Sequence, residues 1–470
     1  MVLKSMIDKL KTLLGTGNYL DDPTDMATYL RPWRGEGMGE AVLVALPKTA
    51  EEVAAIVKHC AETGTSIIPQ AGNTGLVDGS LSGDSNAIIL STSRMRNIRE
   101  VNKEDGSMVV EAGVTLAAIQ EAASGVGKLF PLSMASEGSA MLGGMVATNP
   151  GGTAVLRYGN FRDLVLGREM VLPNGEIYSD LRTLRKNNAG YDLKNLFIGS
   201  EGTLGICTAA ALKLFPQPKQ KTTAFLAVDS MSDALSCFGG LSDAFGGMLT
   251  GFEMLSNQCV EVVGEHMPDI QFPLNESTPY YLLIECSSEL VDMALNDIFE
   301  QTLAGIWETG AIKDAVIAAS EQQAENLWAL RENISESARH FGKGIHFDIA
   351  VPVGQIATFI DETNQVIADK LPDVTTIAFG HMGDGNIHYN QYLGKDTSPE
   401  QMAEIRTTLE DIIYGHCMKL GGTISAEHGV GTDRQEAFYQ HTDPALISLM
   451  QQIKQALDPK GVMNPGKVLK

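Results

Sequence analysis

Histidine and carboxylate residues in two short glycine-flanked segments could bind a divalent metal ion. The segment FGHMGDGNIHYN places His381 and His388 seven residues apart, and SAEHGVG supplies Glu427 beside His428. Only nine histidines occur in the chain, and three lie in these segments. Three imidazoles and a carboxylate suit Zn²⁺ or Mn²⁺. Exposed or packing histidines are the alternative that the pattern leaves open.

Turn-forming residues between the first two histidines decide whether their rings can meet. Seven residues along one regular strand would point the rings to opposite faces of a sheet. Gly383, Asp384 and Gly385 favour a turn, so we expect a hairpin-like reversal that brings the two rings together.

Three glycine-dense stretches suggest a cradle for a phosphate group. In QAGNTGLVDGS, Gly72, Gly75 and Gly79 let the backbone approach an anion closely. Taken alone, this stretch is equally consistent with a surface loop. Two further stretches, 137–159 and 187–206, carry small hydroxyl side chains, namely Ser139, Thr148, Ser200 and Thr203. Together the three favour one large cofactor over a simple anion.

The overall charge limits the partners. The net charge of −23 argues against a polyanion such as nucleic acid. An acidic protein that handles an acidic substrate needs a local cation, and Arg331 in LWALRENISESARH could hold a carboxylate through two parallel hydrogen bonds. A solvated helix-face cation is the commoner fate of a lone arginine.

Element signals indicate how these residues are positioned. At 470 residues the chain is too long for one core. Thr49 and Glu52 predict a capping box before a helix that ends at Gly64, followed by a strand that starts at Ile67. The prolines of PQPKQK predict a domain boundary near residue 217. A C-terminal helix is expected from the cap Asp443 and Pro444, with one apolar face formed by Leu446, Met450, Ile453 and Leu457.

The six cysteines are scattered without a CxxC pair, which favours reduced thiols that fill the core. No stretch approaches 18 apolar residues, and the N-terminus lacks a cleavage signal. We therefore expect a cytoplasmic protein without a transmembrane segment.

The motifs together resemble the FAD-linked dehydrogenases of the vanillyl-alcohol oxidase type, in the branch that holds D-2-hydroxyglutarate, D-lactate and glycolate dehydrogenases. PQAGNTGLVDGS is similar to the pyrophosphate loop of that family and is spelled most like the D-2-hydroxyglutarate branch, although Ala71 and Asp78 replace common glycines. GGMVATNPGGTAVLRYGNFRDLVLG, KNNAGYDLKNLFIGSEGTLGICT and NPGK resemble the other flavin-contacting segments.

The resemblance implies an α+β fold: a two-part FAD-binding domain, a substrate (cap) domain with an antiparallel sheet, and a C-terminal segment that returns to the FAD domain. We assign 1–37 to an N-terminal helical segment, 38–217 to the FAD-binding domain, 218–415 to the substrate domain and 416–470 to the C-terminal segment. The flavin stretches contain no histidine, so non-covalent FAD is expected. The implied FAD-binding residues are Pro69, Gly72, Asn73, Thr74, Gly75, Leu76, Gly138, Ser139, Gly143, Gly144, Thr148, Asn149, Gly151, Gly152, Glu201, Gly202, Gly205, Ile206 and Asn464.

The same resemblance implies roles for the other motifs. His381, His388 and Glu427 correspond to the metal ligands, with Zn²⁺ expected and Mn²⁺ as the alternative, and His428 corresponds to the catalytic base. Substrate-binding positions are Arg331, Ser335, Asn390 and His346. At His346 the related D-2-hydroxyglutarate enzymes usually carry a lysine. A histidine there predicts that affinity for a dicarboxylate falls as the pH rises.

These assignments predict oxidation of a D-2-hydroxy acid to the 2-oxo acid, with D-2-hydroxyglutarate as the first candidate. D-lactate or glycolate is the alternative substrate. The family passes its electrons to an electron-transfer flavoprotein or a quinone, and a homodimer is the commonest assembly of soluble proteins. Two readings of another class are a metal-dependent hydrolase and a non-catalytic flavin electron-relay subunit.

Overall fold

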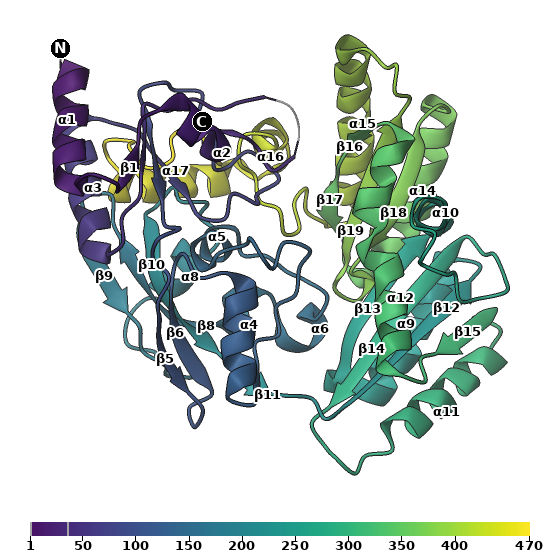
Figure 1. Cartoon of the computed structure of the whole chain (residues 1–470). Coiled ribbons are helices and arrows are strands. Elements are labelled where there is room, and N and C mark those ends of the chain that lie inside the picture. Colours follow the sequence, from purple (N-terminus) through teal and green to yellow (C-terminus); the bar gives the residue numbers. More distant parts are fainter. Residues whose placement is uncertain (1, 35–36) are drawn as a thin grey trace. The chain divides into compact units, whose positions relative to one another are not determined.

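The computed structural model describes residues 2–34 and 37–470, and the chain divides into two units. Unit 1 comprises Met1–Gly151, Gly159–Gln217 and Glu427–Lys470, and unit 2 comprises Gly152–Tyr158 and Pro218–Ala426. The chain therefore leaves unit 1 at Gln217 and returns to it at Glu427. The finer assignment of 1–37, 38–217, 218–415 and 416–470 stays a prediction. Mixed helix and antiparallel sheet confirm the α+β class (Figure 1).

The first sheet of unit 1 has the strand order β1-β2-β4-β3, with β2, β4 and β3 parallel and β1 antiparallel. Apolar side chains of α1 and α3 cover one face of the sheet, and those of α2 cover the other. The elements are β1 (Tyr19–Leu20), β2 (Leu43–Ala45), β3 (Ile67–Gln70), β4 (Ile88–Ser91), α1 (Val2–Leu14), α2 (Pro23–Leu30) and α3 (Ala50–Thr63).

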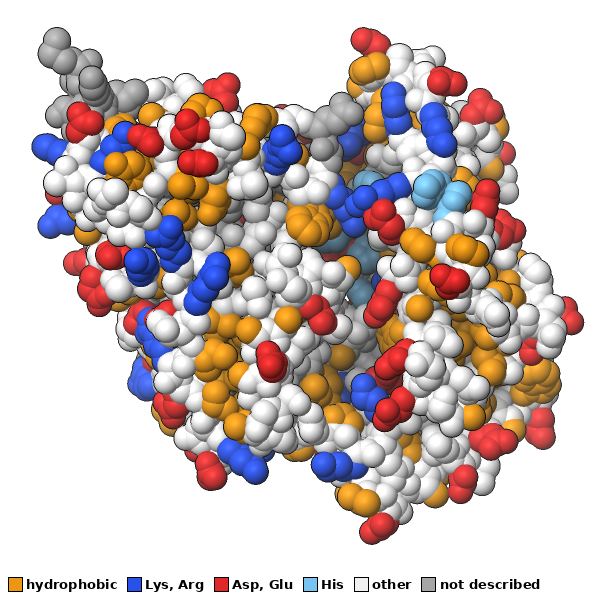
Figure 2. Space-filling view, viewed as in Figure 1, with side chains coloured by type: hydrophobic (Ala, Val, Ile, Leu, Met, Phe, Trp, Pro, Cys, Tyr) orange, Lys and Arg blue, Asp and Glu red, His pale blue; other side chains and the backbone are white. Residues whose placement is uncertain are grey.

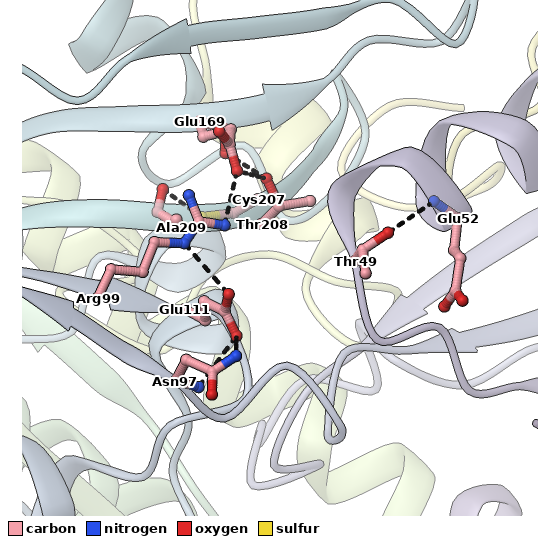
Figure 3. A network of polar contacts seen from close by, with 9 residues as sticks. All are labelled: Thr49, Glu52, Asn97, Arg99, Glu111, Glu169, Cys207, Thr208 and Ala209. Atoms are coloured by element: carbon pink, nitrogen blue, oxygen red, sulfur yellow. Dashed lines mark hydrogen bonds and ion pairs between the residues drawn. The ribbon is translucent and has the colours of Figure 1, made fainter.

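Local signals for α3 and β3 are confirmed with one difference. The Thr49 hydroxyl accepts from the Glu52 N–H, and Gly64 ends the helix in the left-handed conformation at φ 70° (Figure 3). The Glu52 carboxylate, however, accepts from the Lys48 N–H at 2.6 Å, one residue before the position that a capping box would use.

The second sheet of unit 1 is antiparallel, with the order β5-β6-β10-β8-β9. Arg99 donates to Glu111 at 3.1 Å and to Glu169 at 3.0 Å, which joins strands β5, β6 and β8 (Figure 3). The remaining elements of this unit are β5 (Ile98–Asn102), β6 (Ser107–Glu111), β7 (Lys128–Leu129), β8 (Val165–Val171), β9 (Ile177–Asp180), β10 (Ile206–Lys213), β11 (Phe215–Pro216), α4 (Leu116–Gly125), α5 (Leu142–Thr148), α7 (Phe161–Leu164), α8 (Leu193–Phe197), α16 (Gln435–His441) and α17 (Pro444–Leu457).

The helix α17 begins as predicted, but the expected apolar face is partly wrong. Asp443 caps the helix by accepting from the Ala445 N–H, and Pro444 is its first residue. Leu446 is 50% exposed, whereas Ile447 is buried. The predicted residues Met450, Ile453 and Leu457 are half-buried, so the prediction is wrong at Leu446, where Ile447 packs inward instead.

Unit 2 is built on one large sheet of order β15-β12-β14-β13-β18-β19-β16, with β17 also paired to β19. Antiparallel register joins the strands throughout. The strands are β12 (Gln220–Val228), β13 (Leu249–Ser256), β14 (Tyr280–Ser288), β15 (Asp314–Ile317), β16 (Lys343–Ile345), β17 (Asp348–Ala350), β18 (Thr375–Gly380) and β19 (Asn386–Leu393).

Helices cover this sheet and supply its core. A buried cluster joins α10, α12 and α13 to the sheet face that carries Phe225, Leu255 and Phe379. The helical elements are α6 (Val155–Tyr158), α9 (Met231–Phe245), η1 (Gly246–Met248), α10 (Asn257–His266), α11 (Leu295–Glu308), α12 (Glu321–Glu332), α13 (Ile334–Ser337), η2 (Ala338–Phe341), η3 (Val353–Gln355), α14 (Ile356–Lys370), η4 (Met382–Asp384) and α15 (Pro399–Lys419).

All six cysteines are buried and unbridged, as expected of thiols that fill the core. Burial raises the pKa of the Cys60 thiol to about 12, which keeps it protonated. Within the described residues, no helix combines the length and apolar character needed to cross a membrane.

Candidate functional site

Unit 1 contains a cavity of about 630 Å³ at the loops that the sequence marked for cofactor binding. Its walls come from the end of β3, the segment 138–141 and three further segments that lie outside the glycine-dense stretches. The lining residues are Thr28, Tyr29, Gln70, Ala71, Gly72, Asn73, Ser93, Arg96, Gly113, Val114, Thr115, Ala118, Gly138, Ser139 and Met141. Of the implied FAD-binding residues, Gly72, Asn73, Gly138 and Ser139 therefore line one cavity.

Close backbone approach explains the glycine at the start of this cavity. A Cβ at Gly72 would lie 2.1 Å from the carbonyl oxygen of Ser139, so no side chain fits there. Gly75, by contrast, has nothing within 4 Å of its Cβ position. The first and second glycine stretches thus touch at Gly72, which holds two walls of the cavity together.

The third stretch and the C-terminal NPGK segment join the first two. A Cβ at Gly202 would lie 3.0 Å from the Pro69 ring, and Glu201 donates its N–H to the Ala147 carbonyl. The Asn464 amide donates to the carbonyls of Gly79 and Glu201, at 2.9 and 2.7 Å. Its Oδ1 is buried and has no hydrogen-bond partner among the residues that the structure describes. An acceptor left open in this way suits a donor on a bound cofactor.

The Glu201 carboxylate is used within the protein. It accepts from the N–H groups of Val430 and Gly431, each at 2.8 Å, which ties the segment after His428 to the third glycine stretch. Burial raises the pKa of Glu201, and the two N–H donors oppose that shift.

Other implied FAD-binding residues have structural contacts. Asn149 ends α5 at φ 52° and accepts from the Arg162 N–H, and Thr148 donates to the Gly144 carbonyl. Gly205 precedes β10, and Ile206, the first residue of that strand, is part of the core. Gly143 packs on Ala112. Thr74 and Leu76 lie half-buried in the loop after β3. Gly151 donates its N–H to Glu427 at 3.0 Å. Gly152 is the first residue of the unit 2 excursion.

In unit 2 the predicted reversal between the two histidines is confirmed. Strand β18 ends at Gly380, η4 forms the turn, and β19 returns with Phe379 opposite His388. The rings of His381 and His388 come within 5.6 Å of each other between centroids. A Cβ at Gly383 would meet Leu156 at 2.4 Å, so the turn itself is packed against α6.

A fully buried carboxylate binds both His381 and Arg331. Glu253 on β13 places Oε1 2.6 Å from Nδ1 of His381 and accepts from Nε of Arg331 at 2.7 Å through Oε2. Burial alone would raise the pKa of Glu253, but the charges and hydrogen bonds of His381 and Arg331 outweigh it and lower the pKa to about 2. The guanidinium of Arg331 also lies 4.7 Å from the centre of the Phe379 ring. Arg331 is thus held in place, in contrast to the solvated cation that is commoner.

His388 has a carboxylate partner of its own. Nδ1 of His388 lies 3.5 Å from Oδ1 of Asp348, which also accepts from the Asn386 amide at 2.8 Å. The Asp348 carbonyl accepts from the Ala426 N–H, and Glu427 follows Ala426 directly. Within unit 2, Asp348 and His388 each offer a ligand atom that suits a metal ion, and within unit 1 the neighbouring Glu427 and His428 do the same. Of the predicted ligands, His388 thus has a carboxylate neighbour in Asp348, while Nδ1 of His381 is bonded to Glu253.

The predicted substrate residue Asn390 shares a sheet face of unit 2 with His388 and Glu253. Cross-strand partners point to the same side of a sheet. The pairs Leu255 with Phe379, Phe379 with His388, and Ile377 with Asn390 place Glu253, His388 and Asn390 on one side, toward α12 and Arg331.

His346 and Ser335 lie near this face. His346 follows β16, is exposed, and packs edge-on against Tyr392 with 5.9 Å between ring centroids. Ser335 is half-buried in α13, three residues beyond the end of α12.

His428 lies in unit 1, where Nη2 of Arg434 is 3.3 Å from its Nδ1 and its Nε2 is 3.9 Å from Glu427. An arginine only donates, so Nδ1 is the accepting nitrogen in this arrangement.

Sequence reasoning missed Glu253, Asp348 and several walls of the cavity. A signal existed for the two carboxylates, because each is a single charge inside an apolar run, MLTGFEMLS and IHFDIAVP. Charges in such runs are almost never buried unless they are paired. Arg96, Thr115 and Tyr29 carry no comparable signal, since only the fold brings their segments to the cavity.

Two family models match the chain. Residues 41–180 match the "FAD binding domain", and residues 217–468 match "FAD linked oxidases, C-terminal domain". The mitochondrial D-2-hydroxyglutarate dehydrogenase of Rattus norvegicus is 35% identical over 456 residues, which is 96% of this chain and 83% of that protein. The D-2-hydroxyglutarate dehydrogenase of Stutzerimonas stutzeri (strain A1501) is 34% identical over 471 residues, which is 99% of this chain and 98% of that protein.

Solved structures of more distant proteins share the fold. p-Cresol methylhydroxylase with substrate bound superposes with a TM-score of 0.80 at 17% identity, covering 100% of this chain and 97% of that one. Alkyldihydroxyacetonephosphate synthase gives a TM-score of 0.73 at 18% identity, covering 98% and 84%. At these identities the likeness concerns the fold alone.

Proposed function

The chain belongs to the FAD-linked oxidase family that contains the D-2-hydroxyglutarate dehydrogenases, and from this premise we propose that it oxidises D-2-hydroxyglutarate to 2-oxoglutarate. It is an FAD-dependent oxidoreductase. The observation that supports the substrate class is the shared sheet face of unit 2. There Arg331 can bind a carboxylate close to imidazoles that suit a metal ion.

The residues of unit 1 fit FAD. The cavity joins the first two glycine stretches, Gly72 allows close backbone approach, and Asn464 offers a buried acceptor. We propose that this cavity takes the pyrophosphate half of FAD, held without a covalent bond. When bound, the flavin supplies the acceptor for the hydride of the substrate C2–H.

The donors near β19 fit a divalent metal, and Zn²⁺ is our proposal with Mn²⁺ as the alternative. His381, His388 and Glu427 would hold it, and Asp348 would orient His388 through Nδ1. When bound, the metal supplies a Lewis acid that eases loss of the substrate hydroxyl proton.

The remaining steps use the protein's own groups. Arg331 would bind the C1 carboxylate through its two Nη groups, since Nε is already bonded to Glu253. Asn390, Ser335 and His346 would bind the rest of the substrate. His428 would accept the hydroxyl proton. To do so at Nε2 its own ring proton must be on Nδ1, so Arg434 has to release that nitrogen.

His346 gives a specific reason to keep D-lactate or glycolate as a second candidate. Its ring is exposed beside Tyr392, where a lysine would reach a distal carboxylate with a full charge. For the electron acceptor we propose an electron-transfer flavoprotein or a quinone, for the assembly a homodimer, and for the location the cytoplasm.

Anaerobic bleaching of the flavin absorbance tests the proposal. The purified protein is mixed with D-2-hydroxyglutarate, D-lactate, glycolate, D-malate and the L-forms, before and after chelation with metal add-back. We expect fast bleaching by D-2-hydroxyglutarate, lost on chelation and restored by Zn²⁺ or Mn²⁺. Bleaching by a monocarboxylate alone would shift the substrate to D-lactate or glycolate. A yellow protein that no hydroxy acid reduces would indicate an electron-relay subunit.

A further inference from the structure

Glu253 is a charged side chain in the middle of the large sheet of unit 2. It is completely buried on β13, between the buried residues Phe252 and Met254. Burial of a lone carboxylate is very costly, so a buried one persists only when its oxygens are well paired. Removing a partner from such a pair leaves an uncompensated charge, and Glu253 therefore depends on the groups that it binds.

Each oxygen of Glu253 binds one functional group. Oε1 lies 2.6 Å from Nδ1 of His381, and Oε2 accepts from Nε of Arg331 at 2.7 Å. The sheet register sets this geometry, because Met254 pairs with Gly380 and His381 is the next residue of the chain. Arg331 arrives from the last turn of α12 and is held on its other side by the Phe379 ring. One carboxylate thus joins a strand end to a helix end.

The two contacts determine which atoms face the substrate. A histidine that donates from Nδ1 to a carboxylate keeps its lone pair on Nε2, which is the nitrogen left to bind a metal. An arginine bonded through Nε keeps its two Nη groups in one plane for a bidentate carboxylate contact. Those Nη groups make no hydrogen bond within the described part of the chain.

We propose that Glu253 is a positioning residue that sets both the metal-binding tautomer of His381 and the carboxylate-binding orientation of Arg331. This inference rests on the proposed function, and it adds a coupling between the metal site and the substrate-carboxylate site. A change in the position of His381 or Arg331 would therefore affect the other residue through the Glu253 side chain.

The variant Glu253→Gln tests the coupling with little change of shape. Since Arg331 can only donate, the amide oxygen of the glutamine must face Arg331 and its NH₂ group must face His381. The NH₂ group then donates to Nδ1, which moves the ring proton to Nε2 and blocks metal binding there. Glu285→Gln is the matched control, because Glu285 lies on the neighbouring strand β14 and accepts from Trp328 of α12 at 3.3 Å.

Metal affinity is measured by titration calorimetry of Zn²⁺ into the chelator-treated flavoprotein, and KM and kcat are measured with D-2-hydroxyglutarate at saturating metal. Glu253→Gln should weaken the Zn²⁺ Kd by about 10- to 100-fold, the range typical of groups that orient metal ligands. It should also raise KM by about tenfold or more. Glu285→Gln should leave the Kd and KM within twofold of the original protein.

The outcomes separate the inference from the proposed function. If the original protein takes up Zn²⁺ and Glu253→Gln takes it up equally well with unchanged KM, the inference is wrong while the metal site stands. If the original protein takes up no divalent metal, the proposed metal site is wrong and the role of Glu253 fails with it. Should Glu253→Gln not fold, Glu253→Asp decides, because a carboxylate shorter by one methylene cannot reach both partners. Unchanged Kd and KM in that variant would overturn the inference.

Discussion

The side chains proposed to bind substrate and metal lie on one face of the large sheet, and their hydrogen-bond partners are as informative as their identities. Arg331, His381 and His388 each have a buried or nearly buried carboxylate contact. Contacts of this kind restrict rotation and fix tautomers before a substrate arrives. Single substitutions should therefore alter binding more than folding at Arg331 and His346, and both binding and folding at Glu253.

Arg331→Lys should raise KM for D-2-hydroxyglutarate by about 10- to 100-fold. A lysine keeps the charge but loses the planar fork that binds a carboxylate through two parallel bonds while Nε holds Glu253. Steady-state kinetics with a dye acceptor measure the effect. Arg339→Lys is the control, since Arg339 is exposed and pairs with Glu336 three residues earlier. An unchanged KM in Arg331→Lys would mean that Arg331 does not bind the substrate carboxylate.

His346 predicts a pH-dependent affinity. Only a protonated imidazole attracts the distal carboxylate, so the apparent affinity for D-2-hydroxyglutarate should fall as the pH rises from 6 to 8. His346→Lys should remove most of that dependence, because a lysine stays charged over this range. The measurement is KM against pH for both proteins, with D-lactate as the control substrate that has no distal carboxylate. A flat profile in the original protein would contradict the assignment of His346.

Glu253 should make unit 2 sensitive to acid. Its pKa is lowered to about 2 in the folded protein, below the usual value of 4.5, so the paired carboxylate stabilises the fold above pH 4.5. That stabilisation is lost as the pH falls from 4.5 toward 2. At pH 7, Glu253→Gln should cost about 3 to 5 kcal/mol, as for other broken buried pairs. Thermal unfolding of the metal-free proteins should show this difference shrink on acidification, and a constant difference would contradict it.

At the level of elements, the candidate site residues lie mostly in the connections next to the strands and helices. The cavity of unit 1 has walls from the end of β3, the start of α4 and the segment before α5, which are far apart in sequence. In unit 2 the connection between β18 and β19 is the turn η4, which brings His381 and His388 together. Glycines sit where one of these connections touches another.

Gly72→Ala should weaken FAD binding strongly. The added methyl group would lie 2.1 Å from the Ser139 carbonyl oxygen, so one wall of the cavity must move. Gly75→Ala is the matched control in the same loop, because its Cβ position has nothing within 4 Å. Flavin content after purification and the Kd for added FAD measure the effect. We expect a largely colourless Gly72→Ala protein and a yellow Gly75→Ala protein. Equal flavin content in the two variants would mean that Gly72 does not belong to the FAD site.

On the scale of the whole molecule, the net charge of −23 opposes the approach of an anionic substrate. Acidic side chains are scattered over the face drawn in Figure 2 and do not gather in one patch. The attraction for a carboxylate must then come from a few local cations such as Arg331, acting at short range against a repulsive long-range field.

Salt should therefore raise the efficiency of the enzyme at low ionic strength. The Debye length falls from about 30 Å at 0.01 M to about 8 Å at 0.15 M, which screens distant acidic groups more than contacts within the site. We expect kcat/KM for the dianionic substrate to rise a few-fold over this range, with choline chloride and NaCl giving the same result. A steady fall with salt would mean that local cations dominate the encounter.

The amino-acid sequence alone determined the family, the cofactor class and the boundaries of several elements, since these depend on local signals. Thr49, Gly64, Asp443 and Pro444 act on the backbone within a few residues, so α3 begins and ends as predicted and α17 begins as predicted. The turn residues after His381 predicted the reversal for the same reason.

Only the tertiary structure decided which residues face each other. The buried face of α17 was predicted wrongly at its first residue, because periodicity cannot tell which of two apolar neighbours, Leu446 or Ile447, meets the core. Glu253 is 128 residues from His381 and 78 from Arg331, and no local pattern connects them. Strand register placed Glu253 beside His381, and packing of α12 on the same sheet brought Arg331 to them.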